Sequence, residues 1–358
     1  MKKGIAFVMY LVCLMVCFTG CGKKEDEKSD AGKAGTEKTE TKKAESDEAK
    51  QYNIVLVSGD IADAWQVRME EGMVKFQEDT GHNAYMKGPT KSDSSLQAQV
   101  LEDVIAHDID ALIVCPVDAQ VIDPILKKAR EKGIVVISTE GSELKNVDYN
   151  LEPDSPTGIG EKMMEVMAEE MGGKGKYTTM VAYLTYPSHN RWADAAIAYQ
   201  EEHYPDMECI DPAKLECEDN VEVAYERTKE ILKNNPDLNG ILGVTCFSGP
   251  GIAKAVEELG LQGKVTIGGT CVASLNEPYF ESGTIKQETF WDPLKSTYAC
   301  CALAVRLLDD PDFEVKDGLD LGIEGYTDMK VEQTESNTLL KGNAMQIMNK
   351  DNYKDFPW

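Results

Sequence analysis

The sequence has 358 residues, of which 42% are hydrophobic and 28% are charged, a composition ordinary for a protein with folded cores. Its 29 Gly and 14 Pro are too few for a fibrous or low-complexity chain. The formal net charge of −26 argues against nucleic-acid backbones and anionic lipid headgroups as partners, because like charges repel.

The first 20 residues are typical of a secretory signal. Lys2 and Lys3 precede an apolar run over residues 5–17. This run is shorter than the roughly 20 residues that a membrane-spanning helix needs. We therefore predict a cleaved signal peptide over residues 1–20.

The residues around Cys21 predict a lipid anchor. The segment Phe-Thr-Gly-Cys that ends at Cys21 resembles the lipobox of bacterial lipoproteins, which implies a lipid on Cys21; an ordinary cleaved signal with a chance cysteine is the alternative. From residue 22 to 50 the only apolar side chains are those of Ala, so residues 21–50 are expected to form a disordered tether. The two features together predict a body held outside the cytoplasm, against the outer leaflet of a membrane.

The body carries an odd number of cysteines, so at least one thiol is expected to be free unless it pairs between chains. They are Cys115, Cys209, Cys217, Cys246, Cys271, Cys300 and Cys301. Cys209 and Cys217 either pair with each other or serve as small buried hydrophobes. Because there is no CxxC and only 4 His, we predict no metal site and no cofactor.

The body alternates between strand and helix patterns. The expected strands of its first part are 53–57, 111–114 and 134–137, and the helices between them carry apolar faces at Trp65, Met69, Met73 and Phe76 and at Val121, Ile122, Ile125 and Leu126. Apolar strands joined by helices are typical of a parallel sheet that is covered on both faces. The predicted fold class is therefore α/β.

An internal repeat predicts two similar lobes. Segments 110–113 and 133–137, which flank a helix, are echoed by 239–242 and 263–267, at an offset of 129 to 130 residues. In open parallel sheets ligands bind beyond the carboxyl ends of the strands. Two facing α/β lobes would make a cleft that is lined by those ends.

Polar and aromatic residues gather where strands end. The candidate ligand-binding residues are Ser58, Asp60, Trp65, Glu140, Asn190, Arg191, Thr245, Thr270, Trp291 and Asp292. Charged side chains that make paired hydrogen bonds, with an aromatic face over the ring, are typical of sites for polyhydroxylated ligands. The alternatives are that the Trp side chains belong to the core and that Glu140 and Arg191 pair with each other or face water.

Several segments of the sequence resemble a known protein family. The segments ALIVCPVD, GIVVISTE, GILGVTCFSGPGIAKAVEELG and GTIKQETFWDPLKSTYA resemble the type I periplasmic binding proteins of sugar importers. The FWDP segment and the tail NTLLKGNAMQIMNKDNYKDF are most similar to the autoinducer-2-binding and rhamnose-binding branch. The resemblance implies two Rossmann-like lobes joined by a hinge of three crossovers, one sugar-like ligand, and delivery to an ABC permease in the membrane.

The resemblance also implies lobe boundaries. With crossovers near Tyr149, Cys271 and Lys316, the N-terminal lobe takes residues 51–148 plus 272–316, and the C-terminal lobe takes residues 149–271 plus 317–358.

Family positions carry over to five of the candidate residues. The aromatic platform after the first strand falls on Trp65, the Trp-Asp segment falls on Trp291 and Asp292, and a ligand-contacting Arg falls on Arg191. The acid that ends the fourth strand is Glu140 in place of Asp.

Other positions depart from the family pattern. The autoinducer-2 branch has a Lys where this chain reads Val57-Ser58, an Asp-Gln pair at Ser188-His189, and Pro-Asp-Ala at Val244-Thr245-Cys246. Ribose-type proteins have Asn and Asp at Thr245 and Thr270. These departures argue against autoinducer-2 and ribose as the ligand.

The leading hypothesis is a monomeric, lipid-anchored receptor that binds a monosaccharide or related polyol and feeds an ABC importer. One alternative is a sensor that presents its closed form to a membrane receptor or histidine kinase, and another is uptake of an autoinducer-2-like signal. No GxSxG, HExxH, GxxxxGK[ST] or dinucleotide fingerprint occurs, so no enzymatic activity is predicted.

Overall fold

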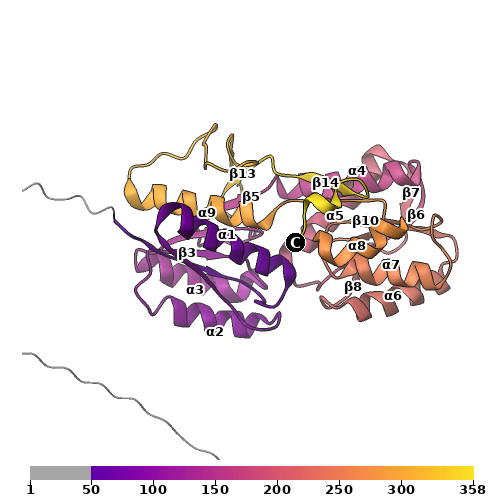
Figure 1. Ribbon diagram of the computed structural model, residues 1–358, viewed down its shortest axis with the longest axis horizontal. Coiled ribbons are helices and arrows are strands. Elements are labelled where there is room, and N and C mark those ends of the chain that lie inside the picture. The colour runs from indigo at the N-terminus through magenta and orange to yellow at the C-terminus, as the bar shows by residue number, and fades with distance from the viewer. Residues whose placement is uncertain (1–49) are drawn as a thin grey trace, which may run out of the picture. The chain divides into compact units, whose positions relative to one another are not determined.

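A computed structural model describes residues 50–358 (Figure 1). The predicted signal peptide, Cys21 and the tether up to residue 49 lie outside the described residues. Lys50–Trp358 forms one compact unit with its own hydrophobic cores. None of the helices in this unit has the length and apolar character that crossing a membrane requires.

The first lobe is built on a seven-stranded sheet. Its order is β12 (Lys330–Gln333), β13 (Thr338–Lys341), β5 (Tyr149–Glu152), β4 (Val135–Ser138), β3 (Ala111–Val114), β1 (Asn53–Val57) and β2 (Asn83–Lys87). All neighbours are parallel except β12, which forms an antiparallel pair with β13. A covered parallel sheet explains why β1 and β3 read as apolar runs.

Helices cover both faces of this sheet. They are α1 (Ala64–Thr80) and α9 (Pro293–Asp309) on one face and α2 (Ser94–Val104) and α3 (Ala119–Glu131) on the other (Figure 1). Because side chains alternate along a strand, Ile54 and Leu56 of β1 enter the core under α1 and α9, whereas Val55 and Val57 enter the core under α2 and α3. The sheet is thereby fixed between two apolar layers.

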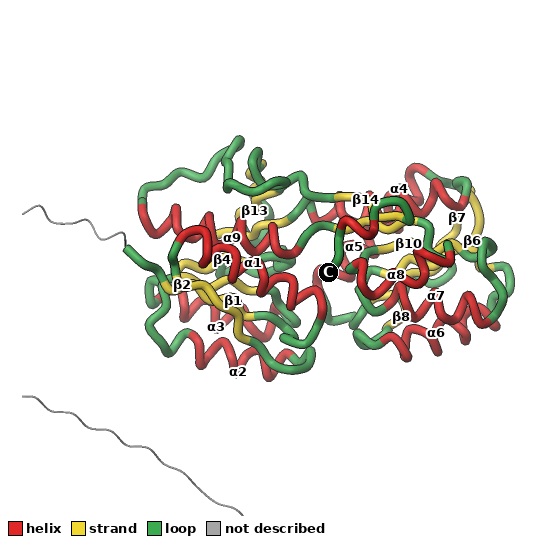
Figure 2. Tube along the Cα trace, viewed as in Figure 1, coloured by secondary structure: helices red, strands yellow, loops and turns green. Residues whose placement is uncertain are grey.

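The second lobe repeats this arrangement with parallel strands. Its strands are β10 (Thr266–Gly269), β9 (Leu238–Gly243), β6 (Lys174–Val181) and β7 (Asp206–Cys209), with β8 (Leu215–Glu216) beside the end of β6. Its helices are α4 (Pro156–Met171), α5 (Pro187–His203), α6 (Val221–Asn234), α7 (Ser248–Glu258) and α8 (Ala273–Ser282), which flank the strands in Figure 2. Gly160 permits the close packing of α4 on α5, since a Cβ there would overlap the carbonyl oxygen of Trp192.

Three segments connect the lobes. Residues 153–155 lead from β5 to α4, residues 291–292 lead from β11 (Gln287–Phe290) to α9, and residues 342–345 lead from β13 to β14 (Gln346–Asn349). Strands β11 and β14 pair antiparallel, and a bridge between Thr270 and Thr289 joins them to β10. The α/β architecture with two parallel sheets agrees with the predicted fold class.

These connections differ from the expected crossovers near Tyr149, Cys271 and Lys316. Strand β5 belongs to the first sheet, so the first connection follows Glu152. Helix α8 packs on α7 and β11 adjoins β10, which keeps residues 273–290 in the second lobe. Residues 330–341 extend the first sheet as β12 and β13. These short, largely polar strands have no apolar run by which the sequence could assign them.

The seven cysteines of the body are all free thiols. Cys217 is buried in the core of the second lobe and Cys209 is half-buried. In this structure Cys209 and Cys217 are therefore not joined by a disulfide, and both act as small hydrophobes.

Candidate functional site

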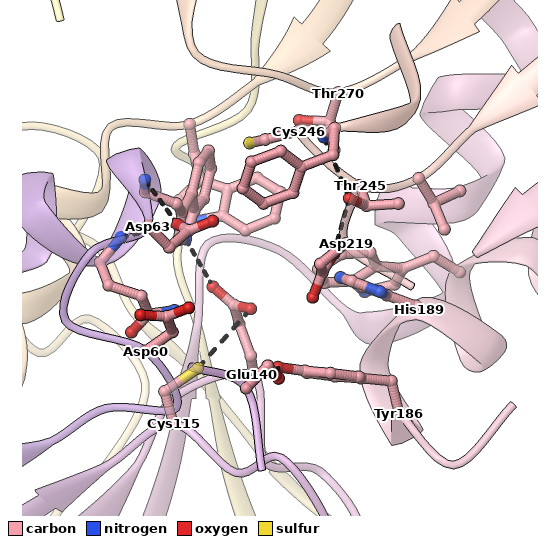
Figure 3. A pocket seen from close by; sticks show the side chains of 17 residues that line it. Asp60, Asp63, Cys115, Glu140, Tyr186, His189, Asp219, Thr245, Cys246 and Thr270 are labelled. Carbon is pink, nitrogen blue, oxygen red and sulfur yellow. Dashed lines mark hydrogen bonds between the residues drawn. The ribbon is translucent and has the colours of Figure 1, made fainter. Parts of the chain in front are cut away.

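A cavity of about 90 Å³ lies between the carboxyl ends of the two parallel sheets (Figure 3). Its lining residues are Asp60, Asp63, Trp65, Gln66, Ser92, Cys115, Glu140, Tyr186, His189, Trp192, Asp219, Val244, Thr245, Cys246, Phe247, Thr270 and Trp291. Both lobes contribute, as expected for a ligand site at the ends of facing sheets.

Six of the ten residues predicted from sequence line this cavity. They are Asp60, Trp65, Glu140, Thr245, Thr270 and Trp291. Of the other four, Ser58 is fully buried after β1, and Asn190 donates from Nδ2 to the carbonyl oxygens of Tyr183 and Tyr186 at 2.9 and 2.7 Å. Neither side chain lines the cavity.

The remaining two, Asp292 and Arg191, have partners elsewhere. Arg68 donates two hydrogen bonds to the carboxylate of Asp292, at 2.9 and 2.8 Å, and Asp292 also caps α9 by accepting from the backbone N–H of Leu294. Arg191 pairs with Glu143, so it joins α5 of the second lobe to the segment after β4 of the first. Arg191 therefore links the lobes beside the cavity instead of pairing with Glu140.

Glu140 is the acid at the centre of the first-lobe wall. Trp65 donates from Nε1 to Oε1 at 3.0 Å, and the thiol of Cys115 lies 3.8 Å from Oε2. Burial raises the pKa of Glu140 to about 7. The backbone φ of Glu140 is 55°, which is unusual for a residue other than Gly, Asn or Asp and is a kind of strain that gathers at binding sites.

Two further acids face the cavity from opposite lobes, as Figure 3 shows. Asp63 caps α1 by accepting from the backbone N–H groups of Trp65 and Gln66, and burial raises its pKa to about 6. Asp219 accepts a hydrogen bond from Thr245 Oγ1 at 2.9 Å and has a φ of 47°. Burial raises the pKa of Asp219 to about 7.

Aromatic rings form a continuous wall across both lobes. Trp291 meets Trp65 and Trp192 edge-on, with ring centroids 4.7 and 5.4 Å apart. Next along the wall, His189 lies 5.4 Å from Trp192 and stacks on Tyr186 at 4.8 Å. Because Trp291 stands in the connection between β11 and α9, the wall bridges the lobes at the hinge.

Polar groups on the second-lobe wall are positioned to donate. The backbone N–H of Ala182 points to Nδ1 of His189 at 3.4 Å, which leaves the ring proton on Nε2, and burial lowers the pKa of His189 to about 4. The hydroxyls of Ser92 and Tyr186 lie 2.9 Å apart across the lobes. The Thr270 hydroxyl is buried without a partner among the described residues.

No group of three or more His, Cys, Asp or Glu within residues 50–358 is arranged to hold a metal ion. The cavity is thus a place where carboxylates, hydroxyls and aromatic faces meet around a small volume. Such an arrangement binds a compact polar molecule by many hydrogen bonds and by contact with rings.

Residues 54–312 match the protein family described as "Periplasmic binding protein domain". The chain belongs to this family. The match covers most of the chain, and it confirms the resemblance seen in the sequence.

A xylitol-binding protein of Mycolicibacterium smegmatis is 26% identical over 182 residues, which is 49% of this chain and 50% of that protein. The chain thus matches about half the length of this relative. The structure of LsrB from Clostridium saccharobutylicum in complex with AI-2 has a TM-score of 0.76 at 18% identity, over 86% of this chain and all of the other. A solute-binding protein from Clostridium phytofermentas with bound L-rhamnose has a TM-score of 0.77 at 18% identity, over 86% of this chain and 98% of the other. Both structures share the fold of this periplasmic binding protein.

Several lining residues of this periplasmic binding protein were not predicted. Asp219 follows β8, a strand of two residues that has no apolar run to mark its end. Asp63 precedes a predicted helix, so its capping position was a signal available in the sequence. Tyr186 precedes α5, and His189 and Trp192 lie in its first two turns. Both belong to the segment 188–192 that the sequence indicated as part of a site, although only Asn190 and Arg191 were predicted to bind the ligand.

Proposed function

We propose that this chain is the lipid-anchored substrate-binding protein of an ABC importer. The observation that carries this proposal is a small cavity, lined from both lobes, in a member of the periplasmic binding protein family. Family membership supports binding over catalysis and a position outside the cytoplasm. A lipid on Cys21 would hold the protein beside its permease.

The proposed ligand is a monosaccharide or a related polyol. The xylitol-binding relative supports this ligand class, as does a cavity in which carboxylates lie beside aromatic faces. The residues proposed to contact the ligand are six that were predicted from sequence, Asp60, Trp65, Glu140, Thr245, Thr270 and Trp291, and two that the structure adds, Asp63 and Asp219. Ser58, Asn190, Arg191 and Asp292 are assigned supporting roles, because their side chains do not line the cavity.

The proposed mechanism is closure of the two lobes about their three connections. In the open form water would fill the cleft, and closure would bury the ligand between the lobes. Hydrogen bonds to carboxylates strengthen when water is excluded, so binding free energy stabilises the closed form. A permease would then recognise that form.

A thermal-shift screen of Lys50–Trp358 tests the proposal. The panel holds pentoses, deoxyhexoses including rhamnose, hexoses, polyols, autoinducer-2 and nucleosides. A ligand at about 100 times its dissociation constant adds about 2.7 kcal/mol of stability, which for a chain of this size raises the melting temperature by several degrees. A shift confined to one class of sugar or polyol is expected. A folded protein that responds to none of them would count against the proposal.

A further inference from the structure

The charges that line the cavity all have one sign. Asp60, Asp63 and Glu140 lie on the wall of the first lobe, and Asp219 lies on the wall of the second. Among the described residues of the lining none is Lys or Arg, and His189 is neutral at neutral pH because burial lowers its pKa to about 4. The cavity therefore gathers four acidic side chains without a cation in its own wall.

The arginines that flank the cleft are already paired. Arg68 contacts both Asp292 and Glu71, and Arg191 contacts Glu143. Asp292, Glu71 and Glu143 do not line the cavity, so neither guanidinium forms an ion pair with an acid of the cavity.

The acids of the cavity also act on one another. Burial is the largest effect that raises the pKa of Glu140, and the charge of Asp63 raises it as well. Burial likewise raises the pKa of Asp219, and both Asp63 and Asp60 add to the rise. Repulsion across the cavity is relieved if a positive charge enters it.

When these acids are ionised, their free hydrogen-bonding atoms are acceptors. Asp60, Asp63 and Asp219 each use Oδ1 to accept from the protein, whereas Oδ2 of each receives no hydrogen bond from the described residues. An ionised carboxylate only accepts, and an ammonium group has three donors and no acceptor. A ligand that carries an ammonium group therefore matches the cavity better than one that carries a carboxylate or phosphate.

The aromatic wall favours the same charge. Trp65, Trp192, Trp291 and Tyr186 all line the cavity. The faces of such rings attract cations, most strongly where water is excluded. The wall and the carboxylates thus select for the same kind of group.

Resting on the proposed function above, we propose that the ligand is a small amino sugar or amino polyol. Its ammonium group is held by the carboxylates of Asp63, Glu140 and Asp219 against the aromatic wall. Its hydroxyl groups take the remaining acceptors and the hydroxyl of Thr270.

Matched pairs of probes test this proposal by calorimetry on Lys50–Trp358. D-glucosamine, D-galactosamine, D-mannosamine and D-glucamine are each compared with the neutral parent sugar or polyol, and N-acetyl-D-glucosamine serves as a sugar whose nitrogen is uncharged. At least one amine is expected to bind at least tenfold more tightly than its parent, about the effect of one good charge-assisted contact. N-acetylation is expected to remove that advantage.

A variant that removes one negative charge from the cavity wall tests which residue causes the preference for an amine. Asp219→Asn keeps an acceptor for Thr245 Oγ1, and Asn tolerates the positive φ at this position. The neighbouring exposed Glu218 also has a positive φ but does not line the cavity, so Glu218→Gln is a control with the same change in charge. The preference for amine over parent is expected to fall at least about fivefold in D219N and to stay unchanged in E218Q. If D219N does not fold, Asp63→Asn, which keeps an acceptor for the cap of α1, gives the second measurement.

The outcomes separate this inference from the proposed function. If the neutral parents bind as tightly as the amines or more tightly, the proposed function stands and the cationic ligand is refuted. If no sugar or polyol binds but spermidine or choline does, the cationic site stands and the sugar-like ligand fails. If a folded protein binds none of these probes, both are refuted. Equal loss of preference in D219N and E218Q would also overturn the assigned contact.

Discussion

Glu152, the last residue of β5, is a buried acid whose protonation should govern how stability changes with pH. It is 2% exposed, and its Oε2 receives no hydrogen bond from the described residues, while Asn150 donates to Oε1 at 2.8 Å. Burial raises the pKa of Glu152 to about 8, and the charge of Glu140 acts in the same direction. We predict that Glu152→Gln stabilises the protein at alkaline pH.

The sign follows from proton binding. The unfolded chain loses this proton near the ordinary pKa of 4.5, whereas the folded protein keeps it up to a pKa of about 8. Between these values the folded state binds more protons, so the contribution to stability is fully present below pH 4.5 and is lost as the pH rises to about 8. The loss over this window has a ceiling of about 5 kcal/mol.

Urea unfolding near pH 5 and near pH 9 measures this difference. Near pH 5 the free energy of unfolding of E152Q is expected to lie within about 1 kcal/mol of the wild-type value. Near pH 9 it is expected to exceed the wild-type value by about 2 to 5 kcal/mol. Glu202→Gln, at an exposed position of α5, is the control and should follow the wild type at both values. If the free energies of unfolding of E152Q and wild type differ by the same amount near pH 5 and near pH 9, the reasoning is refuted.

Three further predictions concern the lobe contacts, the aromatic wall and the thiols. Arg191→Met removes an ion pair between two side chains that are each 37% exposed, so it should weaken ligand binding by no more than about fivefold in calorimetry; a hundredfold loss would instead place Arg191 on the ligand. Trp291→Ala leaves a void at a side chain that is 1% exposed, and it should lower the free energy of unfolding by about 3 to 5 kcal/mol; an unchanged urea midpoint would contradict its central packing. Alkylation of the unfolded body without reductant should label all seven cysteines, as counted by mass spectrometry, because each thiol is free; two missing labels at Cys209 and Cys217 would mean that the pair is oxidised.

The fold was largely predictable because its signals are local. Buried parallel strands such as β1 and β3 are apolar along their whole length, and the helices between them repeat apolar residues every three or four positions. The repeat of this unit then indicated a second lobe. The lobe boundaries were less predictable, because β12 and β13 are short and are recognisable only by the sheet that they join.

The site was predictable only in part, because strand ends indicate where side chains gather but not which partners they choose. Glu140 and Trp65 were both expected at the cavity, and a hydrogen bond joins them there. Asp292 also stands at a strand end, yet it pairs with Arg68, which is 224 positions away in the chain. Such a pairing depends on how α1 packs beside α9, and no pattern within either segment encodes it.

The tryptophans of this protein are unevenly distributed, with a consequence for observing it in solution. Of the 4 Trp in the chain, Trp65, Trp192 and Trp291 line the cavity, and only Trp358 does not. Indole emission depends on nearby charge and on contact with water, and the indole N–H of Trp65 is bonded to Glu140. Intrinsic fluorescence therefore reports mainly on the cavity. Occupancy and the rate of lobe movement should be readable by stopped-flow mixing, without a dye or label.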